Sequence, residues 1–311
     1  ADVAFALEQD LDYLALSFVR RAEELAQLRS LVPRSMLVIA KIEKDAALHN
    51  IESILRAADG VMVARGDLGV ELPFEEVPIA QKRIIRLANL LGRPVITATQ
   101  MLESMVEHPR PTRAEASDVA NAIIDGTDAV MLSAETAAGA FPRLAVEAMR
   151  RIVIEIETQP VPEWAGGPSW GLPVWGRSEE RRERRAEHQP VVTSEEAIAA
   201  ATVAAARMIA TPLVIVLTKS GFSARTVASH RPGVPVLALT DDPRTYRQLA
   251  LVWGVIPHLA EHAPTYEVML AYARTAALER RLARPGDRVL VTAGVPFDVP
   301  GTTNLLKVEL M

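Results

Sequence analysis

The chain has 311 residues, of which 49% are hydrophobic and 23% are charged, so it is long enough for two globular domains with substantial cores. A formal charge of −5 argues against a surface that binds nucleic acid or an anionic membrane. The absence of cysteine excludes disulfides and thiol chemistry and fits a cytoplasmic protein; we expect neither a membrane-spanning segment nor a signal peptide.

Apolar runs alternate with helical segments throughout residues 1–157. The pattern predicts strands at residues 13–19, 38–42, 60–64, 94–100 and 129–133. It predicts helices near residues 21–32, 46–57, 76–91, 113–124 and 141–157. Near-continuous apolar strands separated by helices indicate a parallel sheet that is covered on both faces.

Residues 158–192 interrupt this alternation with Pro and Gly and a run of charges, which favours a linker with a solvated charged helix. A second unit, residues 193–311, opens on Thr193-Ser194-Glu195-Glu196, a capping-box pattern that begins an Ala-rich helix. The later pattern predicts a long helix near 265–283 and strands at 213–218, 235–239, 255–259, 287–293 and 303–309. These elements indicate a compact α/β domain.

One apolar strand ends in Lys41-Ile42-Glu43. Because side chains alternate along a strand, Lys41 and Glu43 point the same way. The next strand leads into a loop that holds Asp67. Two carboxylates and an ammonium group at neighbouring strand ends suit a divalent cation and an anionic substrate. The structural alternative for Lys41 is an ion pair with a nearby acid at the strand end.

Several strings resemble the pyruvate kinase family in their order and spacing. They are Lys41-Ile42-Glu43, Met62–Glu71, Ala98–Met105, Pro109–Glu115, Asp118–Ala122 and Met131–Thr136. The resemblance covers nearly all of residues 1–157 and resumes over residues 193–311. In the family the first unit is a (β/α)8 TIM barrel, and the strands predicted here correspond to its last five. The resemblance therefore implies a partial TIM barrel, a linker at residues 158–192 and a C-terminal α/β domain for allostery and oligomerisation.

The resemblance also implies an activity, the phosphoryl transfer between phosphoenolpyruvate and ADP that gives pyruvate and ATP in glycolysis. Glu43 and Asp67 would hold Mg²⁺ or Mn²⁺, and Lys41 would neutralise the transferring phosphoryl group and the enolate. Thr99 would lie near the enolate carbon, and the backbone N–H groups of Gly66 and Asp67 would bind the substrate carboxylate. Most of the family's K⁺ site lies in a part of the barrel without a counterpart here.

Other positions keep two interpretations open. Glu135 either contacts the site or forms a structural ion pair, and Glu71 fits the orientation of the loop better than a third metal ligand. Arg110 and Arg113 lie in a Pro-rich loop that resembles a subunit-contact segment, with plain surface charge as the alternative. The resemblance implies a homotetramer.

The turn from Thr218 to Arg225 is rich in hydroxyls and backbone amides. It resembles the family's allosteric loop, which implies that a phosphorylated small-molecule effector binds there; a plain helix cap is the alternative. The later segment 292–298 lacks the Trp and Arg with which some animal members of the family bind a bisphosphate. The resemblance therefore favours a monophosphate as the effector. The residues assigned to the effector phosphate are Thr218, Lys219, Ser220, Gly221 and Ser223.

The family's first three barrel strands and its small β domain have no counterpart in this sequence. A barrel that lacks three strands loses part of its packed interior and exposes two strand edges. We therefore expect the isolated chain to be inactive and its barrel half to be marginally stable unless a second polypeptide closes it. Two alternative functions are a non-catalytic regulatory or assembly remnant and another metal-dependent barrel enzyme that handles pyruvate enolate.

Overall fold

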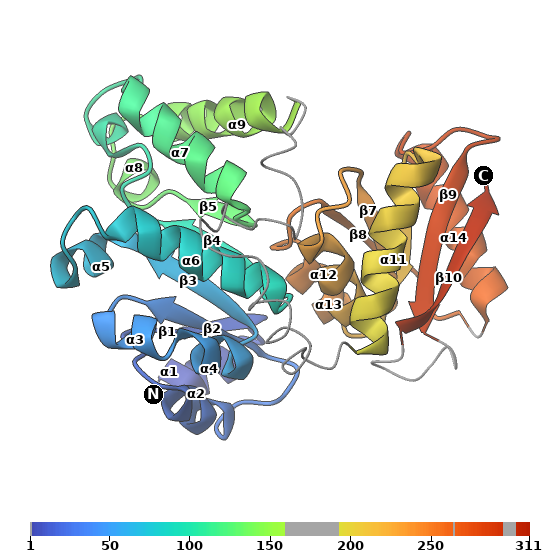
Figure 1. Ribbon diagram of the computed structural model, residues 1–311, viewed down its shortest axis with the longest axis horizontal. Helices are drawn as coiled ribbons and strands as arrows, with labels where there is room; N and C mark the ends of the chain where they lie inside the picture. Colours follow the sequence, from blue (N-terminus) through green and yellow to red (C-terminus); the bar gives the residue numbers. More distant parts are fainter. Residues whose placement is uncertain (1, 159–192, 264, 295–302) are drawn as a thin grey trace, which may run out of the picture. The chain divides into compact units, whose positions relative to one another are not determined.

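The structure is a computed structural model that describes residues 2–158, 193–263, 265–294 and 303–311 (Figure 1). These residues form two compact units. The first holds the described residues up to Thr158 together with Leu251–Trp253, and the second holds the remainder. The linker predicted at residues 158–192 lies outside the described residues except for Thr158, so the predicted domain boundaries stay predictions.

The first unit is built on a parallel sheet of five strands in the order β1-β2-β3-β4-β5 (Figure 1). They are β1 (Tyr13–Leu16), β2 (Leu37–Ile42), β3 (Gly60–Ala64), β4 (Val95–Ala98) and β5 (Ala129–Met131). All five predicted strands are present, and their parallel direction is confirmed. β1 and β5 are the sheet edges, so the described strands form an open part of a TIM-like barrel.

Helices precede and follow the strands, and several of them cover the outer face of the sheet. They are α1 (Asp2–Glu8), α2 (Ala22–Arg29), α3 (Asp45–His49), α4 (Ile51–Ala57), α5 (Arg65–Glu71), α6 (Val77–Leu90), the 3-10 turn η1 (Glu103–Val106), α7 (Arg113–Asp125), α8 (Ala134–Ala137) and α9 (Pro142–Thr158). The sequence predicted α2, α6, α7 and α9, and it predicted one helix where α3 and α4 stand. That helix is divided at Asn50, whose side-chain amide donates to Arg20 O at 3.0 Å and Ala46 O at 3.1 Å.

The two faces of the sheet carry different side chains. Val38, Ala40 and Ile42 of β2 pack against the helices in the main core of this unit. Ile39 lies on the inner face in a smaller cluster with residues of β3 and β4. Because side chains alternate, Lys41 continues the inner row that Ile39 begins. The strand therefore directs Lys41 towards the barrel interior, at the carboxyl end of the sheet.

Helix α5 is a correction to the loop that was predicted after β3. Asp67 lies in the first turn of this helix, which begins directly at the strand end. Leu68 and Leu72 are buried, and they pack with Ala80 of α6 in a small apolar cluster. This burial stabilises a short helix that contains Gly66 and Gly69, although glycine disfavours helix on its own.

Two aspartates fix the amino-terminal ends of the strands. Asp59 precedes β3, and its carboxylate accepts the Val38 N–H at 2.8 Å and pairs with Arg29. Asp128 precedes β5, and its carboxylate accepts the Val95 N–H at 2.9 Å. Each aspartate thus ties the start of one strand to the backbone of its neighbour. Residues at this end of a barrel serve stability rather than catalysis.

The connection from β4 to α7 is held by two glutamates. Glu135 is completely buried and accepts the Leu102 N–H at 3.0 Å. Glu115 accepts the Ser104 N–H at 2.7 Å and the Ser104 hydroxyl at 2.6 Å, and it forms a capping box with Thr112 at the start of α7. Burial acts to raise the pKa of Glu115, but the hydrogen bonds from Ser104 and Thr112 outweigh it and hold the pKa below its ordinary value.

The second unit is a sheet in the order β10-β9-β6-β7-β8. The strands are β6 (Val214–Leu217), β7 (Val236–Thr240), β8 (Val255–Leu259), β9 (Arg288–Gly294) and β10 (Thr303–Leu310). β10 runs antiparallel to β9, and the other neighbouring pairs are parallel. All the strands predicted for this unit are present.

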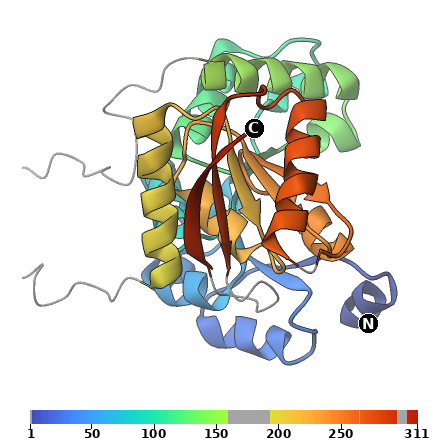
Figure 2. The same cartoon turned by 90° about the vertical axis from the view of Figure 1, so that its right-hand side faces the viewer.

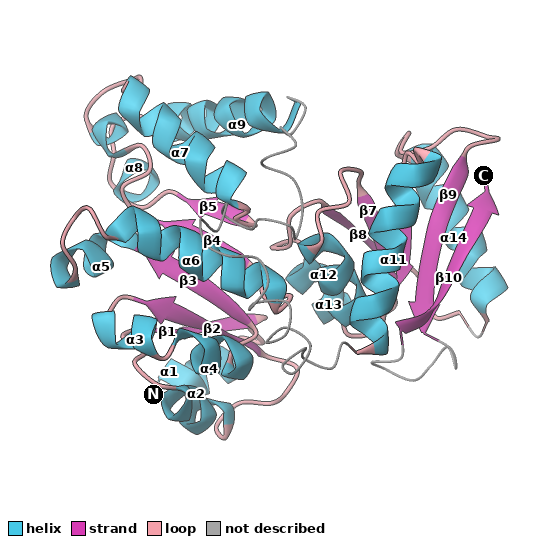
Figure 3. Ribbon diagram, in the orientation of Figure 1, coloured by secondary structure: helices cyan, strands magenta, loops and turns pink. Residues whose placement is uncertain are grey.

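Helices α11 (Ser194–Ile209) and α14 (Tyr266–Glu279) cover opposite faces of this sheet (Figures 2 and 3). The remaining helices of the unit are α12 (Phe222–Ser229) and α13 (Pro243–Leu249). The capping box predicted at Thr193 is confirmed, because Thr193 Oγ1 accepts the Glu196 N–H and Glu196 accepts the Thr193 N–H at 2.9 Å. Among the described helices, none is both long and apolar enough for a bilayer crossing.

The environment of Glu115 predicts a pH dependence. A carboxyl group whose pKa is lowered in the folded state contributes stability that is present above its unfolded pKa of about 4.5 and is lost as the pH falls through the folded pKa. Glu115→Gln should therefore reduce the fall in melting temperature of the first unit between pH 7 and pH 3.5, measured by differential scanning calorimetry. Glu103→Gln, which changes an exposed acid of the same connection, is the matched control. Equal falls in the Glu115→Gln variant and the unaltered protein would contradict this role.

Candidate active site

The carboxyl end of β2 brings Lys41 and Glu43 together, as the alternation of side chains predicts. Lys41 Nζ lies 2.6 Å from Glu43 Oε1 and donates to Ser17 Oγ at 3.0 Å. Ser17 follows β1, whose last residue Leu16 pairs with Ala40, so the register places Ser17 beside Lys41. The strand-end ion pair considered for Lys41 is therefore present. Ser17 was not among the residues predicted for the site.

Glu43 is a buried carboxylate with two protein partners. Its side chain is 1% exposed, and its second oxygen accepts the Phe18 N–H at 2.6 Å. Burial of an ionised carboxylate is unfavourable unless it is paired and hydrogen-bonded, and Lys41 and the Phe18 amide meet that requirement. Each carboxylate oxygen has two lone pairs, so these contacts leave acceptor capacity for a cation.

Asp67 is the other carboxylate that is predicted to bind the metal. It is exposed in the first turn of α5, and no hydrogen bond or ion pair joins it to Lys41 or Glu43 in the described part of the chain. Within residues 2–158 and the other described ranges, no three acidic or histidine side chains form a group that could hold a metal. Among the described residues, a cation here would therefore be bound by no more than two carboxylates together with other ligands.

The ends of β3 and β4 meet through Gly66 and Thr99. The Gly66 N–H donates to Thr99 Oγ1 at 2.8 Å, and this hydroxyl donates to Ala98 O at 2.6 Å. A Cβ at Gly66 would lie 3.4 Å from Thr99 Oγ1, which is an ordinary contact. The packing around Gly66 therefore does not by itself require glycine, and the close approach of a substrate stays the predicted reason for it.

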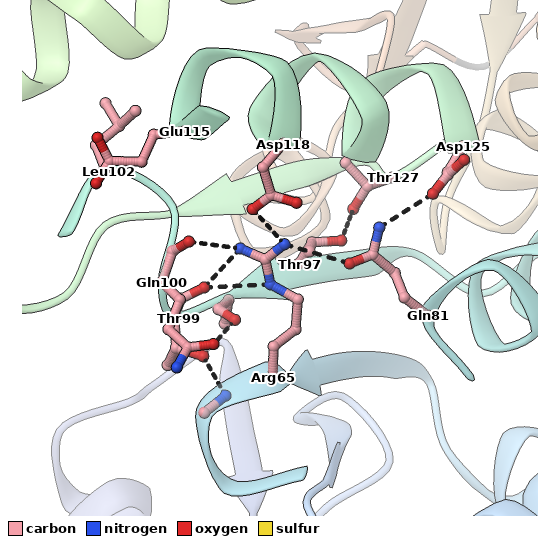
Figure 4. A network of polar contacts seen from close by, with 12 residues as sticks. Arg65, Gln81, Thr97, Thr99, Gln100, Leu102, Glu115, Asp118, Asp125 and Thr127 are labelled. Carbon is pink, nitrogen blue, oxygen red and sulfur yellow. Dashed lines mark hydrogen bonds and ion pairs between the residues drawn. The ribbon is translucent and has the colours of Figure 1, made fainter. Parts of the chain in front are cut away.

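Arg65 is a central residue of this region that the sequence did not identify (Figure 4). It is 6% exposed at the start of α5. Its guanidinium donates to Thr99 O at 2.7 Å and to Gln100 O at 3.0 Å, and it pairs with Asp118 at 2.6 Å. An arginine directly after a buried apolar strand is the signal that could have identified it, because arginine is rarely buried without partners.

The Arg65 contacts continue into a polar network between α6 and α7 (Figure 4). Arg65 Nη1 lies 3.4 Å from Gln81 Oε1, and the Gln81 amide donates to Asp125 at 3.0 Å. Asp125 also pairs with Lys82. The network therefore connects the end of β3 to two helices on the outer face of the sheet.

The structure also places the residues that had two interpretations. Glu71 pairs with Lys44 at 2.6 Å, which suits an orienting role in preference to metal binding. Glu135 accepts backbone N–H groups, including that of Ser133 at 2.7 Å, rather than forming an ion pair among the described residues. Arg110 and Arg113 are exposed, and their role in subunit contact stays a prediction.

The predicted effector loop forms the turn between β6 and α12. Thr218 Oγ1 accepts the Gly221 N–H at 3.0 Å, and the Ser223 hydroxyl contacts Thr303. Lys219 Nζ lies 2.5 Å from Asp241. Ser220 is exposed. The hydroxyls of Thr218 and Ser223 thus have partners within the unit, but no side chain caps α12 at its N-cap residue Gly221. Phosphate binding at this turn stays a prediction.

His262 also lies at this turn, 2.8 Å from the Asp241 carboxylate. Burial acts to raise the pKa of Asp241, but hydrogen bonds from Lys219 and His262 outweigh it and hold that pKa below its ordinary value. Asp241 is therefore a carboxylate at neutral pH. An anion that approached Lys219 would compete with it.

Comparisons with known proteins match both units to one family. Residues 1–146 match the family described as the pyruvate kinase barrel domain, and residues 196–309 match the pyruvate kinase alpha/beta domain. A solved structure of a pyruvate kinase from Cryptosporidium parvum superposes with a TM-score of 0.85 at 37% identity, over 99% of this chain and 60% of that one.

Curated relatives give the same result. The chain is 45% identical to a pyruvate kinase of Geobacillus stearothermophilus over 100% of its own length and 51% of the relative. It is 45% identical to a pyruvate kinase of Agrobacterium vitis over 99% of its length and 60% of the relative. The chain thus spans about half to three-fifths of the length of these relatives. The sequence identity to these relatives and the two domain matches show that the chain belongs to the pyruvate kinase family, a family of metal-dependent phosphotransferases.

Proposed function

We propose that this chain supplies the phosphoenolpyruvate side of a pyruvate kinase active site, which transfers a phosphoryl group between phosphoenolpyruvate and ADP. The observation that carries the proposal is the meeting of the Lys41 ammonium and the Glu43 carboxylate 2.6 Å apart at the carboxyl end of β2. The Gly66–Thr99 contact lies at the same end of the next two strands. Barrel enzymes place their catalytic groups at this end of the sheet.

The reaction breaks the bond between the phosphorus and the enol oxygen of phosphoenolpyruvate. A new bond forms from that phosphorus to a terminal phosphate oxygen of ADP, and the enolate left behind takes a proton at carbon to give pyruvate. Lys41 would stabilise the negative charge on the phosphoryl group and the enolate oxygen. The Thr99 hydroxyl would lie near the enolate carbon, where it can relay that proton through water. The Gly66 and Asp67 N–H groups would bind the substrate carboxylate, so the Gly66 N–H would be shared between that carboxylate and Thr99 Oγ1.

The carboxylates of Glu43 and Asp67 fit a hard divalent cation such as Mg²⁺ or Mn²⁺. Carboxylate oxygens are the ligands these ions prefer, and two protein ligands leave positions for substrate and water. A bound cation would neutralise charge on the substrate oxygens. In the absence of the cation, Lys41 orients Glu43, because the ammonium contacts one carboxylate oxygen directly.

Further parts of the proposal concern the setting of the reaction. The family resemblance supports ATP binding. It also allows K⁺, although most of the family's K⁺ site lies in a part of the barrel without a counterpart here. It also supports a homotetramer with contacts through Arg110 and Arg113, and regulation by a phosphorylated effector at Thr218, Lys219, Ser220, Gly221 and Ser223. The composition and a role in glycolysis support the cytoplasm. We propose that a closed barrel is needed for turnover, so the 311-residue chain alone should not catalyse the reaction.

The proposed metal ligands predict a specific pattern of Mn²⁺ binding. Glu43→Gln and Asp67→Asn should each weaken Mn²⁺ binding by at least about 10-fold, because even groups that only orient a metal ligand contribute on the order of 10–100-fold. Lys41→Met should not weaken Mn²⁺ binding, because it removes a neighbouring positive charge that repels the cation rather than a ligand. Titration followed by electron paramagnetic resonance measures the free Mn²⁺.

Glu75→Gln is the matched control for these variants, because Glu75 is an exposed acid in the connection between α5 and α6 and has no assigned role. Its Mn²⁺ affinity should equal that of the unaltered chain. Phosphoryl transfer is then assayed in a longer polypeptide with a closed barrel, where Lys41→Met should abolish turnover. Equal loss of Mn²⁺ affinity in Lys41→Met and Glu43→Gln would contradict the assigned roles. A family member that serves only in regulation or assembly would show no turnover even before substitution.

Ser17 should contribute to phosphoenolpyruvate binding through Lys41. Ser17→Ala removes an acceptor that lies 3.0 Å from the ammonium, and a hydrogen bond to a charged group is worth about 1.5–3 kcal/mol at most. We expect phosphoenolpyruvate affinity in the presence of Mn²⁺ to fall by roughly 3- to 10-fold, measured by calorimetry. Ser30→Ala, in a residue whose hydroxyl donates to Gln27 O away from the strand ends, is the control. Unchanged affinity in Ser17→Ala would exclude this contribution.

A further inference from the structure

We propose that Arg65 is a positioning residue that holds the Thr99–Gln100 turn in a left-handed conformation and thereby sets the Thr99 hydroxyl on the Gly66 N–H. The inference deepens the proposed function, since it rests on Thr99 and Gly66 as groups that meet the substrate. Arg65 itself has no assigned contact with substrate or metal. Its contribution would pass entirely through the turn.

The turn after β4 is strained. Thr99 has a φ of 67° and Gln100 a φ of 54°, so two consecutive residues other than glycine adopt the left-handed region. This conformation is unfavourable for residues with a Cβ, and most of all for a β-branched residue such as threonine. Such a turn persists only where surrounding contacts impose it.

The guanidinium of Arg65 makes the contacts that impose it. Nη2 donates to both carbonyl oxygens of the turn, to Thr99 O at 2.7 Å and to Gln100 O at 3.0 Å, and Nε donates to Thr99 O at 3.2 Å. The planar fork of arginine suits two adjacent carbonyls, whereas lysine carries a single ammonium on a flexible stem. The Asp118 carboxylate, 2.6 Å from Nη1, compensates the charge and fixes the fork in place.

Arg65 also precedes Gly66 directly, so one residue influences both partners of the hydrogen bond between the Gly66 N–H and Thr99 Oγ1. Its backbone begins α5 next to the Gly66 N–H, and its side chain fixes the turn that carries Thr99. The Thr99 hydroxyl accepts from Gly66 N and donates to Ala98 O, which defines its orientation fully. If the turn relaxed to an unstrained conformation, the Thr99 side chain would leave the Gly66 N–H.

The first experiment measures the Gly66 amide by hydrogen exchange in the full 311-residue chain. Arg65→Lys should lower the protection of the Gly66 amide by roughly 10-fold, as expected when a hydrogen bond to a charged group no longer supports the contact. The strand amides of Val61–Val63 should keep their protection. Arg29→Lys is the control, because Arg29 also binds a carboxylate and a backbone carbonyl, that of Met36, but does not contact the Thr99–Gln100 turn. Unchanged Gly66 protection in Arg65→Lys would overturn the proposal.

A second experiment tests whether strain is the cause. Gln100 is exposed, and Gln100→Gly removes the penalty of its left-handed conformation. Gln100→Gly should therefore restore at least about a third of the Gly66 protection that Arg65→Lys loses, on the premise that glycine adopts φ > 0 freely. A purely structural role of Arg65 in the core would not be rescued by this exposed substitution, so absence of rescue would overturn the proposal. If Arg65→Lys does not fold, Asp118→Asn, which loosens the same guanidinium, should also lower the protection of the Gly66 amide, but by a smaller factor.

The third experiment connects the turn to the substrate through a double-mutant cycle with phosphoenolpyruvate and Mn²⁺. Arg65→Lys should weaken phosphoenolpyruvate binding by roughly 10-fold when Thr99 is present and by less than about 2-fold in a Thr99→Ala background. Equal, additive losses would show that Arg65 acts elsewhere and would overturn the proposal. If the unaltered chain binds no phosphoenolpyruvate, the proposed function fails for this chain, and the exchange and rescue results alone decide the role of Arg65.

Discussion

The alignment of parallel strand ends is the constraint on which the rest of the first unit depends. Asp59 and Asp128 each join the start of one strand to the backbone N–H of a neighbour, Val38 and Val95 respectively. In a parallel sheet, a register fixed at the start also fixes which residues stand side by side at the end. A shift by one residue would direct Lys41 to the helix-covered face. Asp59 and Asp128, at the amino-terminal ends of the strands, thus help to keep Lys41 in position at the carboxyl end.

Two acids of this unit, Glu43 and Glu135, are equally buried but have different partners and therefore different roles. Glu43 and Glu135 are both almost fully buried. Glu135 binds two backbone N–H groups in a closed arrangement and so holds a connection in place. Glu43 shares its charge with Lys41, a partner that is 25% exposed and can respond to a substrate. A buried acid with a partly exposed cationic partner is therefore the better candidate for function, because a substrate can reach that partner.

The sequence predicted the strands well and the polar contacts poorly, for a physical reason. Each strand is a local apolar run, so β2 and β3 could be identified without their neighbours. The pairing of Lys41 with Glu43 is local too, since it follows from strand alternation. The contacts of Arg65 join residues 34 and 53 positions away, which no local pattern records. Helix α5 was missed because tertiary burial of Leu68, rather than helix propensity, stabilises a segment with two glycines.

The energies of the Thr99–Gln100 turn show why a buried arginine stands beside it. Each left-handed residue other than glycine is unfavourable by about 1–3 kcal/mol, so the turn stores about 2–6 kcal/mol. A hydrogen bond to a charged group contributes about 1.5–3 kcal/mol, and Arg65 binds both carbonyls of the turn. The two quantities are of the same order, whereas two neutral backbone contacts of about 1 kcal/mol each would match only the lower end of the range. A conformation this unfavourable and this closely matched by one cation is expected where the position of a hydroxyl matters to chemistry.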